Sequence, residues 1–139
     1  MKLPFCKYHG AGNDFILINN FSGNYHLTER QINALCHRRF GVGADGLMLL
    51  EKDEPPFGYF MNFFNSDGTE GTMCGNGGRC LVAFADRLGL KNHYFRSIDG
   101  PHTGQVLERS GLYVKVKLQL NGVEKIKLYD KNSYVVDTG

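Results

Sequence analysis

The chain has 139 residues, 42% of them hydrophobic and 12% aromatic, and its sixteen Lys and Arg against fourteen Asp and Glu leave a net charge of +2. This is enough apolar material for one globular domain, and the even charge argues against binding to nucleic acid or anionic lipid. The N-terminus lacks the apolar core of a secretory signal, and no stretch approaches the ~18 apolar residues of a membrane span, so we expect a cytoplasmic protein.

Two short strands are predicted at the start of the chain, over residues 3–9 and 15–19. The segment between them, residues 10–14, reads Gly-Ala-Gly-Asn-Asp. These residue types tolerate the backbone conformations of tight turns, which β-branched residues avoid. The chain is therefore expected to open with a strand, a tight turn and a second strand.

A helix is predicted next, from Thr28 to Arg39. Thr28 and Gln31 fit a capping box, in which each side chain accepts a hydrogen bond from the backbone N–H of the other residue. Apolar residues, the last of them Phe40, then recur at helical spacing. Gly41 is expected to stop the helix.

The middle of the chain predicts two more strands and a second helix. The strands cover residues 47–51 and 59–65, separated by the sequence Asp-Glu-Pro-Pro, which ends regular structure because proline lacks a backbone donor. The helix runs from Cys74 to Leu88, with Gly89 placed to cap its end. Its apolar residues fall on more than one face, so we expect the rest of the domain to wrap around it.

The remaining third of the chain is predicted to be strands. The clearest one alternates Val, Val, Leu and Leu with Lys, Lys and Gln, the period of a half-buried strand. With the earlier strands the total is about eight around one buried helix, an α+β fold with a mixed or antiparallel sheet in a single domain, residues 1–139. The predicted strands in this part cover residues 94–98, 104–109, 112–120, 125–129 and 134–136.

Residues 41–46 match the pattern G-x-G-x-x-G of dinucleotide-binding loops. Such a loop follows a strand and opens a helix, whereas this one follows a predicted helix and opens a predicted strand. The sequence G-x-x-x-x-G-K-[ST] of phosphate-binding loops does not occur. We therefore expect no nucleotide at these glycines.

The four cysteines are Cys6, Cys36, Cys74 and Cys80. In a cytosolic chain we expect them to be reduced, and the usual role of Cys6, Cys36 and Cys80 would be that of small buried apolar residues. Neither the cysteines nor the five histidines have the paired spacings of a zinc site, so no metal is expected.

Cys74 differs from the others because it stands where a glycine-rich turn becomes a helix. The free N–H groups and positive end of a helix favour a thiolate, which makes Cys74 a candidate reactive cysteine. The amides of Gly75 and Asn76 could hold a substrate carboxylate at the same place. Local physics alone leaves the reactive and the inert interpretation of Cys74 equally open.

Four motifs in order along the chain resemble diaminopimelate epimerase. Together they extend from residue 9 to residue 80 in the family's order, which makes the resemblance specific. The motifs are His-Gly-Ala-Gly-Asn-Asp-Phe at 9–15, Gly-Val-Gly-Ala-Asp-Gly at 41–46, Phe-Asn-Ser-Asp-Gly-Thr-Glu at 64–70 and Met-Cys-Gly-Asn-Gly-Gly-Arg-Cys at 73–80.

The resemblance implies two similar domains, each a sheet around a central helix, with the active site between them and one catalytic cysteine from each. Cys74 would be the cysteine of the first domain. Asn13 and Asn65 would bind the substrate through their side-chain amides, and Gly75 and Asn76 would bind its carboxylate through backbone N–H groups. The family inverts an α-carbon with two thiols and no cofactor, interconverting LL- and meso-diaminopimelate.

Two further implications concern what the sequence lacks. Gly46 stands where some family members have a substrate-contacting glutamine, so that contact is either lost or supplied by another group. The chain ends at Gly139, where the family continues into a second domain, so we expect a half-enzyme that is inactive alone. Its expected partners are that domain and the amino-acid substrate.

Two alternatives stay open. One is another isomerase of the same superfamily, such as a proline racemase or a phenazine-biosynthesis isomerase, although the sequence from Cys74 to Arg79 with Asn13 and Asn65 favours the diaminopimelate branch. The other is a non-catalytic domain that binds a small carboxylate, or that forms a homodimer through apolar surface left uncovered by the second domain.

Overall fold

The computed structural model describes residues 2–123 and 126–136. Within these ranges the chain forms two helices and nine strands. The helices are α1 (Glu29–Cys36) and α2 (Gly75–Arg87). The strands are β1 (Cys6–Gly10), β2 (Asn13–Asn20), β3 (Gly46–Glu51), β4 (Phe60–Asn65), β5 (Tyr94–Ser97), β6 (Gly100–Ser110), β7 (Tyr113–Gln119), β8 (Ile126–Asp130) and β9 (Ser133–Val136).

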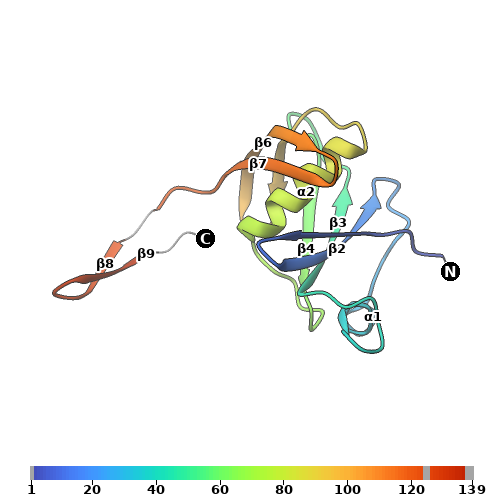
Figure 1. Ribbon diagram of the computed structural model, residues 1–139, viewed down its shortest axis with the longest axis horizontal. Coiled ribbons are helices and arrows are strands. Elements are labelled where there is room, and N and C mark those ends of the chain that lie inside the picture. The colour runs from blue at the N-terminus through green and yellow to red at the C-terminus, as the bar shows by residue number, and fades with distance from the viewer. Residues whose placement is uncertain (1, 124–125, 137–139) are drawn as a thin grey trace.

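Seven strands form one sheet, in which the spatial order follows the chain order from β1 to β7. Neighbouring strands are antiparallel except β2–β3 and β4–β5, which are parallel. Each parallel pair needs a crossover, and α1 and α2 lie in these two connections. Because α2 packs against β1 and β2 and also against β6 and β7, the sheet curls around it (Figure 1). This confirms the predicted α+β fold with a sheet wrapped around a hydrophobic helix.

Strands β2 and β3 are buried on both faces, which explains why their sequences are continuous apolar runs. On one face Phe15 and Leu17 join the main core around α2. On the other face Ile16 and Ile18 pack with Ile32 of α1 in a second cluster. Burying an aliphatic or aromatic side chain of this size stabilises a fold by about 1.5–3 kcal/mol.

The central helix begins and ends as predicted, with Cys74 as its N-cap and Leu88 as its C-cap. Gly89 follows in the left-handed region with φ of 90°. Strand β6 approaches the helix so closely at Gly104 that a Cβ there would lie 2.4 Å from Cγ2 of Val82. A glycine is therefore required where the sheet closes over the middle of α2.

Helix α1 has the predicted capping box between Thr28 and Gln31, but the predicted end was wrong. The helix ends at Cys36 and not at Arg39, and Phe40 lies outside it with 89% of its surface exposed. The cause is the following loop. Backbone N–H groups of Gly43 and Ala44 donate to the carbonyls of Leu35 and Cys36, which another helical turn would otherwise have used.

The last two strands also depart from the prediction, which placed them with the others around the helix. β8 and β9 pair with each other in a separate two-stranded sheet. In Figure 1 this hairpin projects away from the body of the domain. Its apolar side chains, such as Leu128 and Tyr134, are 65% exposed. Seven strands, and not eight, therefore surround α2; the predicted start at Lys125 lies outside the described residues.

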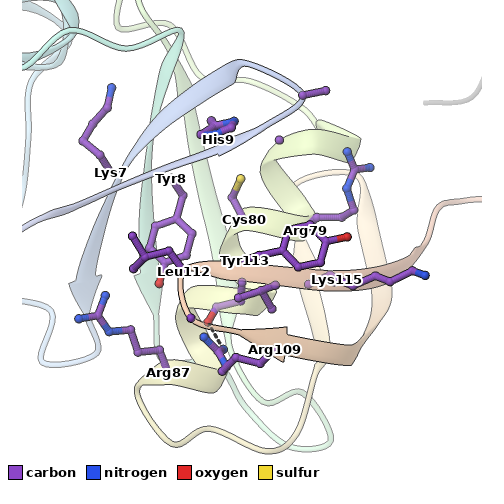
Figure 2. Close-up of a pocket in the computed structure, with 16 residues that line it drawn as sticks. Lys7, Tyr8, His9, Arg79, Cys80, Arg87, Arg109, Leu112, Tyr113 and Lys115 are labelled. Carbon is purple, nitrogen blue, oxygen red and sulfur yellow. Dashed lines mark hydrogen bonds between the residues drawn. The ribbon is translucent and has the colours of Figure 1, made fainter.

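The curled sheet leaves its two edge strands, β1 and β7, facing each other across α2. A groove of about 830 Å³ lies between them (Figure 2). Cationic side chains are prominent in its lining and carboxylates do not occur among the residues that line it. The cations are Lys7, Arg79, Arg87, Arg109 and Lys115.

Neither of the two described helices has the length and apolarity needed to cross a bilayer.

Candidate active site at the start of α2

The segments that carry the predicted site residues meet at one end of the strands. The turn after β1 ends at Asn13, which pairs with Gly10. Two residues further along β2, Phe15 pairs with Gly46 at the start of β3, and on its other side Gly46 pairs with Asn65 at the end of β4. The start of α2 lies at the same end of the strands, since a Cβ on Gly77 would lie 3.4 Å from both Phe15 Cζ and Cys74 Cβ.

Cys74 caps the central helix with its backbone in an extended conformation, φ −113° and ψ 120°. Its side chain makes no capping hydrogen bond, and no acidic residue lies in the first helical turn. The thiol is half-buried, and Sγ lies 3.6 Å from Oδ1 of Asn13, to which it donates. The first turn therefore presents a partly accessible thiol together with the N–H groups that a helix start leaves without intrahelical partners.

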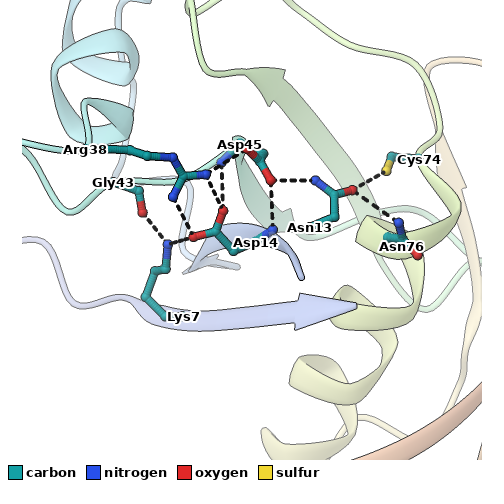
Figure 3. Close-up of polar contacts among 8 residues, drawn as sticks. All are labelled: Lys7, Asn13, Asp14, Arg38, Gly43, Asp45, Cys74 and Asn76. Carbon is teal, nitrogen blue, oxygen red and sulfur yellow. Dashed lines mark hydrogen bonds and ion pairs between the residues drawn. The ribbon is translucent and has the colours of Figure 1, made fainter. Parts of the chain in front are cut away.

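Asn13 uses both ends of its side-chain amide (Figure 3). Its Oδ1 accepts from Cys74 and also from Nδ2 of Asn76, at 3.3 Å. Its Nδ2 donates to Oδ2 of Asp45 at 2.9 Å. Asn76 is held in turn by Arg79, which donates to Asn76 Oδ1. These hydrogen bonds join Asn13, Cys74 and Asn76 into one cluster. The Asn13 side chain therefore bonds residues of other segments and not the backbone of its own turn.

Asn65 is arranged differently, although it has the same predicted role as Asn13. Its Nδ2 donates to Thr69 Oγ1 at 3.2 Å, and that hydroxyl donates to Asp67 Oδ1 at 2.6 Å. The amide is thus bonded within the turn that follows β4, and the residue is exposed. Substrate binding by Asn65 stays a prediction.

An ionic network behind Asn13 was not anticipated from the sequence. Arg38 bridges two carboxylates, with Nη2 2.8 Å from Asp14 Oδ1 and 2.7 Å from Asp45 Oδ1. Lys7 lies 2.6 Å from Asp14 Oδ2. Asp14 and Asp45 belong to the motifs quoted above, but contacts between positions 31 residues apart leave no local signal in a sequence.

The network keeps both carboxylates ionised. The hydrogen bond from Arg38, followed by those from Lys7 and the backbone, holds the pKa of Asp14 well below its usual range against the opposing effect of burial. The pKa of Asp45 is also lowered, first by the hydrogen bond from Asn13 and then by those from the Asp14 amide and Arg38. Asp45 is therefore a fixed acceptor for the Asn13 amide at neutral pH.

Gly46 has no room for a side chain. A Cβ there would lie 2.6 Å from Cε2 of Phe63 and 2.8 Å from the carbonyl oxygen of Phe64. The Phe63 ring thus fills the space beside this residue. A larger residue at this position would have to displace that ring.

The other three cysteines lie in different surroundings, and all four are free thiols. Burial raises the pKa of Cys36, and it raises the pKa of Cys80 to about 12. Cys6 packs against the main core. Across the ranges that the structure describes, no group of three or more His, Cys, Asp or Glu side chains is arranged to hold a metal ion.

Comparison with known proteins points to one family. The family model described as diaminopimelate epimerase matches residues 5–139. Diaminopimelate epimerase from Flavobacterium psychrophilum is 46% identical over 145 residues, covering 100% of this chain and 52% of the relative. The enzyme of that name from Chlorobaculum tepidum is 52% identical over 96 residues, covering 68% of this chain and 37% of the relative. The chain thus spans about half, or less, of the length of these curated relatives.

A solved structure supports the fold. The phenazine biosynthesis protein of the PhzF family from Bacillus anthracis superposes with a TM-score of 0.60, covering 90% of this chain and 41% of that one. The identity is 16%, so the likeness concerns the fold and carries nothing about the reaction.

Proposed function

The chain belongs to the diaminopimelate epimerase family, and from this premise we propose that it supplies one half of an active site that interconverts LL- and meso-diaminopimelate without a cofactor. Cys74 is the acid/base residue of this half. The observation that carries the proposal is the cluster at the start of α2, where the Cys74 thiol contacts Asn13 beside helix N–H groups. A second thiol comes from protein outside this chain.

Inversion of an α-carbon requires a base on one face and an acid on the other. In one direction the Cys74 thiolate removes the α-proton, and the electron pair stays on the α-carbon. The second thiol then delivers a proton to the opposite face, and the two exchange roles in the reverse direction. Electron density that spreads into the substrate carboxylate is stabilised by the amides of Gly75 and Asn76 at the helix start.

The side chains around Cys74 support binding of an amino acid. Asn13 lies against the thiol, and Asn65 lies at the same end of the strands, two strands away in the sheet. We infer that Asn65 exchanges its bond to Thr69 for one to the substrate, since an exposed side-chain bond within a turn is readily replaced. The two amides would then flank the reacting carbon.

The test is deuterium incorporation from solvent into LL-diaminopimelate, followed by mass spectrometry. We expect incorporation when this chain is combined with the other half of a family member. Cys74→Ala should reduce the rate by about 10²–10⁴-fold, the contribution of a positioned acid/base group. Cys6→Ala, which removes a thiol outside the cluster, should leave incorporation unchanged.

Three outcomes would contradict the proposal. Full turnover by this chain alone that survives Cys74→Ala would exclude Cys74 as the acid/base group. Incorporation into proline and not into diaminopimelate would assign the chain to a different isomerase. Absence of incorporation into either substrate, with the two halves assembled, would favour a domain that binds carboxylates without catalysis.

A further inference from the structure

The orientation of the Asn13 amide depends on a residue that touches neither Cys74 nor the helix. An ionised carboxylate can only accept hydrogen bonds, so the Asn13 group facing Asp45 must be the NH₂ donor. The carbonyl oxygen Oδ1 then has to face Cys74 and Asn76. If the amide turned over, two oxygen acceptors would face each other across the 2.9 Å that now separates Nδ2 from Asp45.

Asp45 is itself fixed from three sides. Its Oδ2 accepts the Asp14 backbone N–H at 3.1 Å in addition to Asn13, and its Oδ1 accepts from Arg38 at 2.7 Å. Arg38 also bonds Asp14, so the carboxylate cannot rotate without loss of several charge-assisted bonds. The side chain is 44% exposed, which leaves it outside the core and makes its role one of orientation.

The direction in which Asn13 points affects the chemistry of Cys74. A carbonyl oxygen accepts a hydrogen bond from an S–H group and repels the negative charge of a thiolate, whereas an NH₂ group would stabilise the thiolate. The helix start acts in the opposite sense, because its N–H groups attract negative charge. Two opposed influences therefore meet at Sγ, and one of them is set by Asp45.

We propose that Asp45 is a positioning residue that holds the Asn13 oxygen against Cys74 and so favours the S–H donor over the thiolate at this position in the free protein. The proposal rests on the function proposed for Cys74. The ionisable groups around the cluster include Arg79 and Cys80 on α2, and on the opposite side the network of Asp14, Asp45, Arg38 and Lys7. Of these, Asp45 bonds the Asn13 side chain directly.

The test needs no substrate, so its failure can be separated from failure of the proposed function. The rate of alkylation by iodoacetamide is measured against pH on the intact chain, and the peptide that contains Cys74 is quantified by mass spectrometry. Asp45→Leu removes the acceptor that holds the Asn13 NH₂ group away from sulfur and leaves only the Asn76 donor on Oδ1. We expect the midpoint of the profile to fall, with alkylation at neutral pH about tenfold faster, the effect of one exchanged hydrogen bond.

A double exchange calibrates the effect of an oxygen acceptor on this thiol. Asn13→Asp combined with Asp45→Asn again places an oxygen acceptor toward sulfur, now with a negative charge, so the midpoint should rise and alkylation at neutral pH should slow by tenfold or more. Because the added carboxylate repels a thiolate whatever the role of Asp45, the decisive variant is Asp45→Leu. Faster alkylation there supports the proposal, and unchanged or slower alkylation overturns it.

The matched control is Asp14→Asn, which removes a carboxylate from the same network without contact to the Asn13 side chain. Its alkylation rate should stay within about twofold of the parent chain, since the Asp45–Asn13 bond remains. An equal change in Asp14→Asn and Asp45→Leu would show that only the total charge matters, and the proposal would be wrong.

Discussion

The first turn of α2 and its middle each carry a cysteine, and the two surroundings give the same side chain different chemistry. Cys74 is half-buried at the helix start and bonded to an amide from another element. Cys80 lies six residues further along, 4% exposed among apolar side chains. The first turn is organised by hydrogen bonds and ion pairs, whereas the middle is organised by close packing. Position along one helix thus separates a thiol bonded to polar side chains from a thiol that is part of the core.

The largest expected difference between the two regions is in thiol alkylation. Burial raises the pKa of Cys80 to about 12 from an ordinary value of 9.0. At neutral pH its thiolate population should therefore be about 1000-fold smaller than that of an ordinary thiol. We expect iodoacetamide to modify Cys74 at least ~100-fold faster than Cys80 in the folded chain. The difference should vanish in denaturant, and equal rates without denaturant would contradict it.

A smaller difference is expected from adding a methyl group to a glycine in each region. In Gly104→Ala the new Cβ would lie 2.4 Å from Val82 Cγ2 at the middle of the helix. Overpacking of this kind costs about 1–3 kcal/mol, measured as the free energy of unfolding in urea. Gly75→Ala is the matched control at the helix start, where a Cβ would lie in ordinary contact with Leu120 Cδ1, at 3.9 Å.

For Gly75→Ala the free energy of unfolding should stay the same or rise by up to ~0.5 kcal/mol, because alanine restricts the unfolded chain. If Gly75→Ala lowered the free energy of unfolding more than Gly104→Ala does, the helix start and not the middle of α2 would be the more closely packed region.

The smallest expected effect concerns acid. The pKa of Asp14 in the folded state is held below its ordinary value of 3.8, chiefly by Arg38. A carboxyl group of this kind stabilises the fold fully above its unfolded pKa, and the contribution is lost as pH falls toward the folded value. Asp14→Asn should therefore lower the free energy of unfolding by roughly 0.5 kcal/mol at pH 7, since the pairs are partly exposed.

The same difference should shrink progressively as pH falls below about 4, because the unfolded chain then binds a proton at Asp14 that the folded chain still excludes. Urea unfolding at neutral and acidic pH measures it. The cost of Gly104→Ala should not depend on pH over this range, because no charge is involved. A constant penalty for Asp14→Asn at all pH values would show that the ion pairs contribute nothing to stability.

The sequence predicted most of the fold because the local signals were consistent. The capping box at Thr28, the apolar faces of α2 and the alternation in β7 each correspond to an element in the structure. The end of α1 could not be predicted, since it depends on hydrogen bonds from Gly43 and Ala44 in the next loop. The separate pairing of β8 with β9 likewise depends on tertiary contacts, which the periodicity of a strand does not predict.

For the candidate site, the sequence predicted which residues take part but not how they are bonded to one another. Cys74, Asn13 and Asn76 were named from motifs, and the structure brings them together. The bond from Asn13 to Asp45 joins positions 32 residues apart, so only the sheet register could reveal it. The contrast between Asn13 and Asn65 was also hidden, because both follow the same rule of an asparagine beside a turn.

The match between strand order and chain order has a consequence for how the chain assembles. Each strand from β2 to β7 pairs with the strand that precedes it in sequence, so the sheet can grow by successive short closures. Every residue of the Cys74 cluster lies before the end of α2, whereas β6 and β7 come afterwards and cover the helix with Val106, Val116 and Leu118. During synthesis the polar cluster therefore leaves the ribosome before the hairpin that completes the core around its helix.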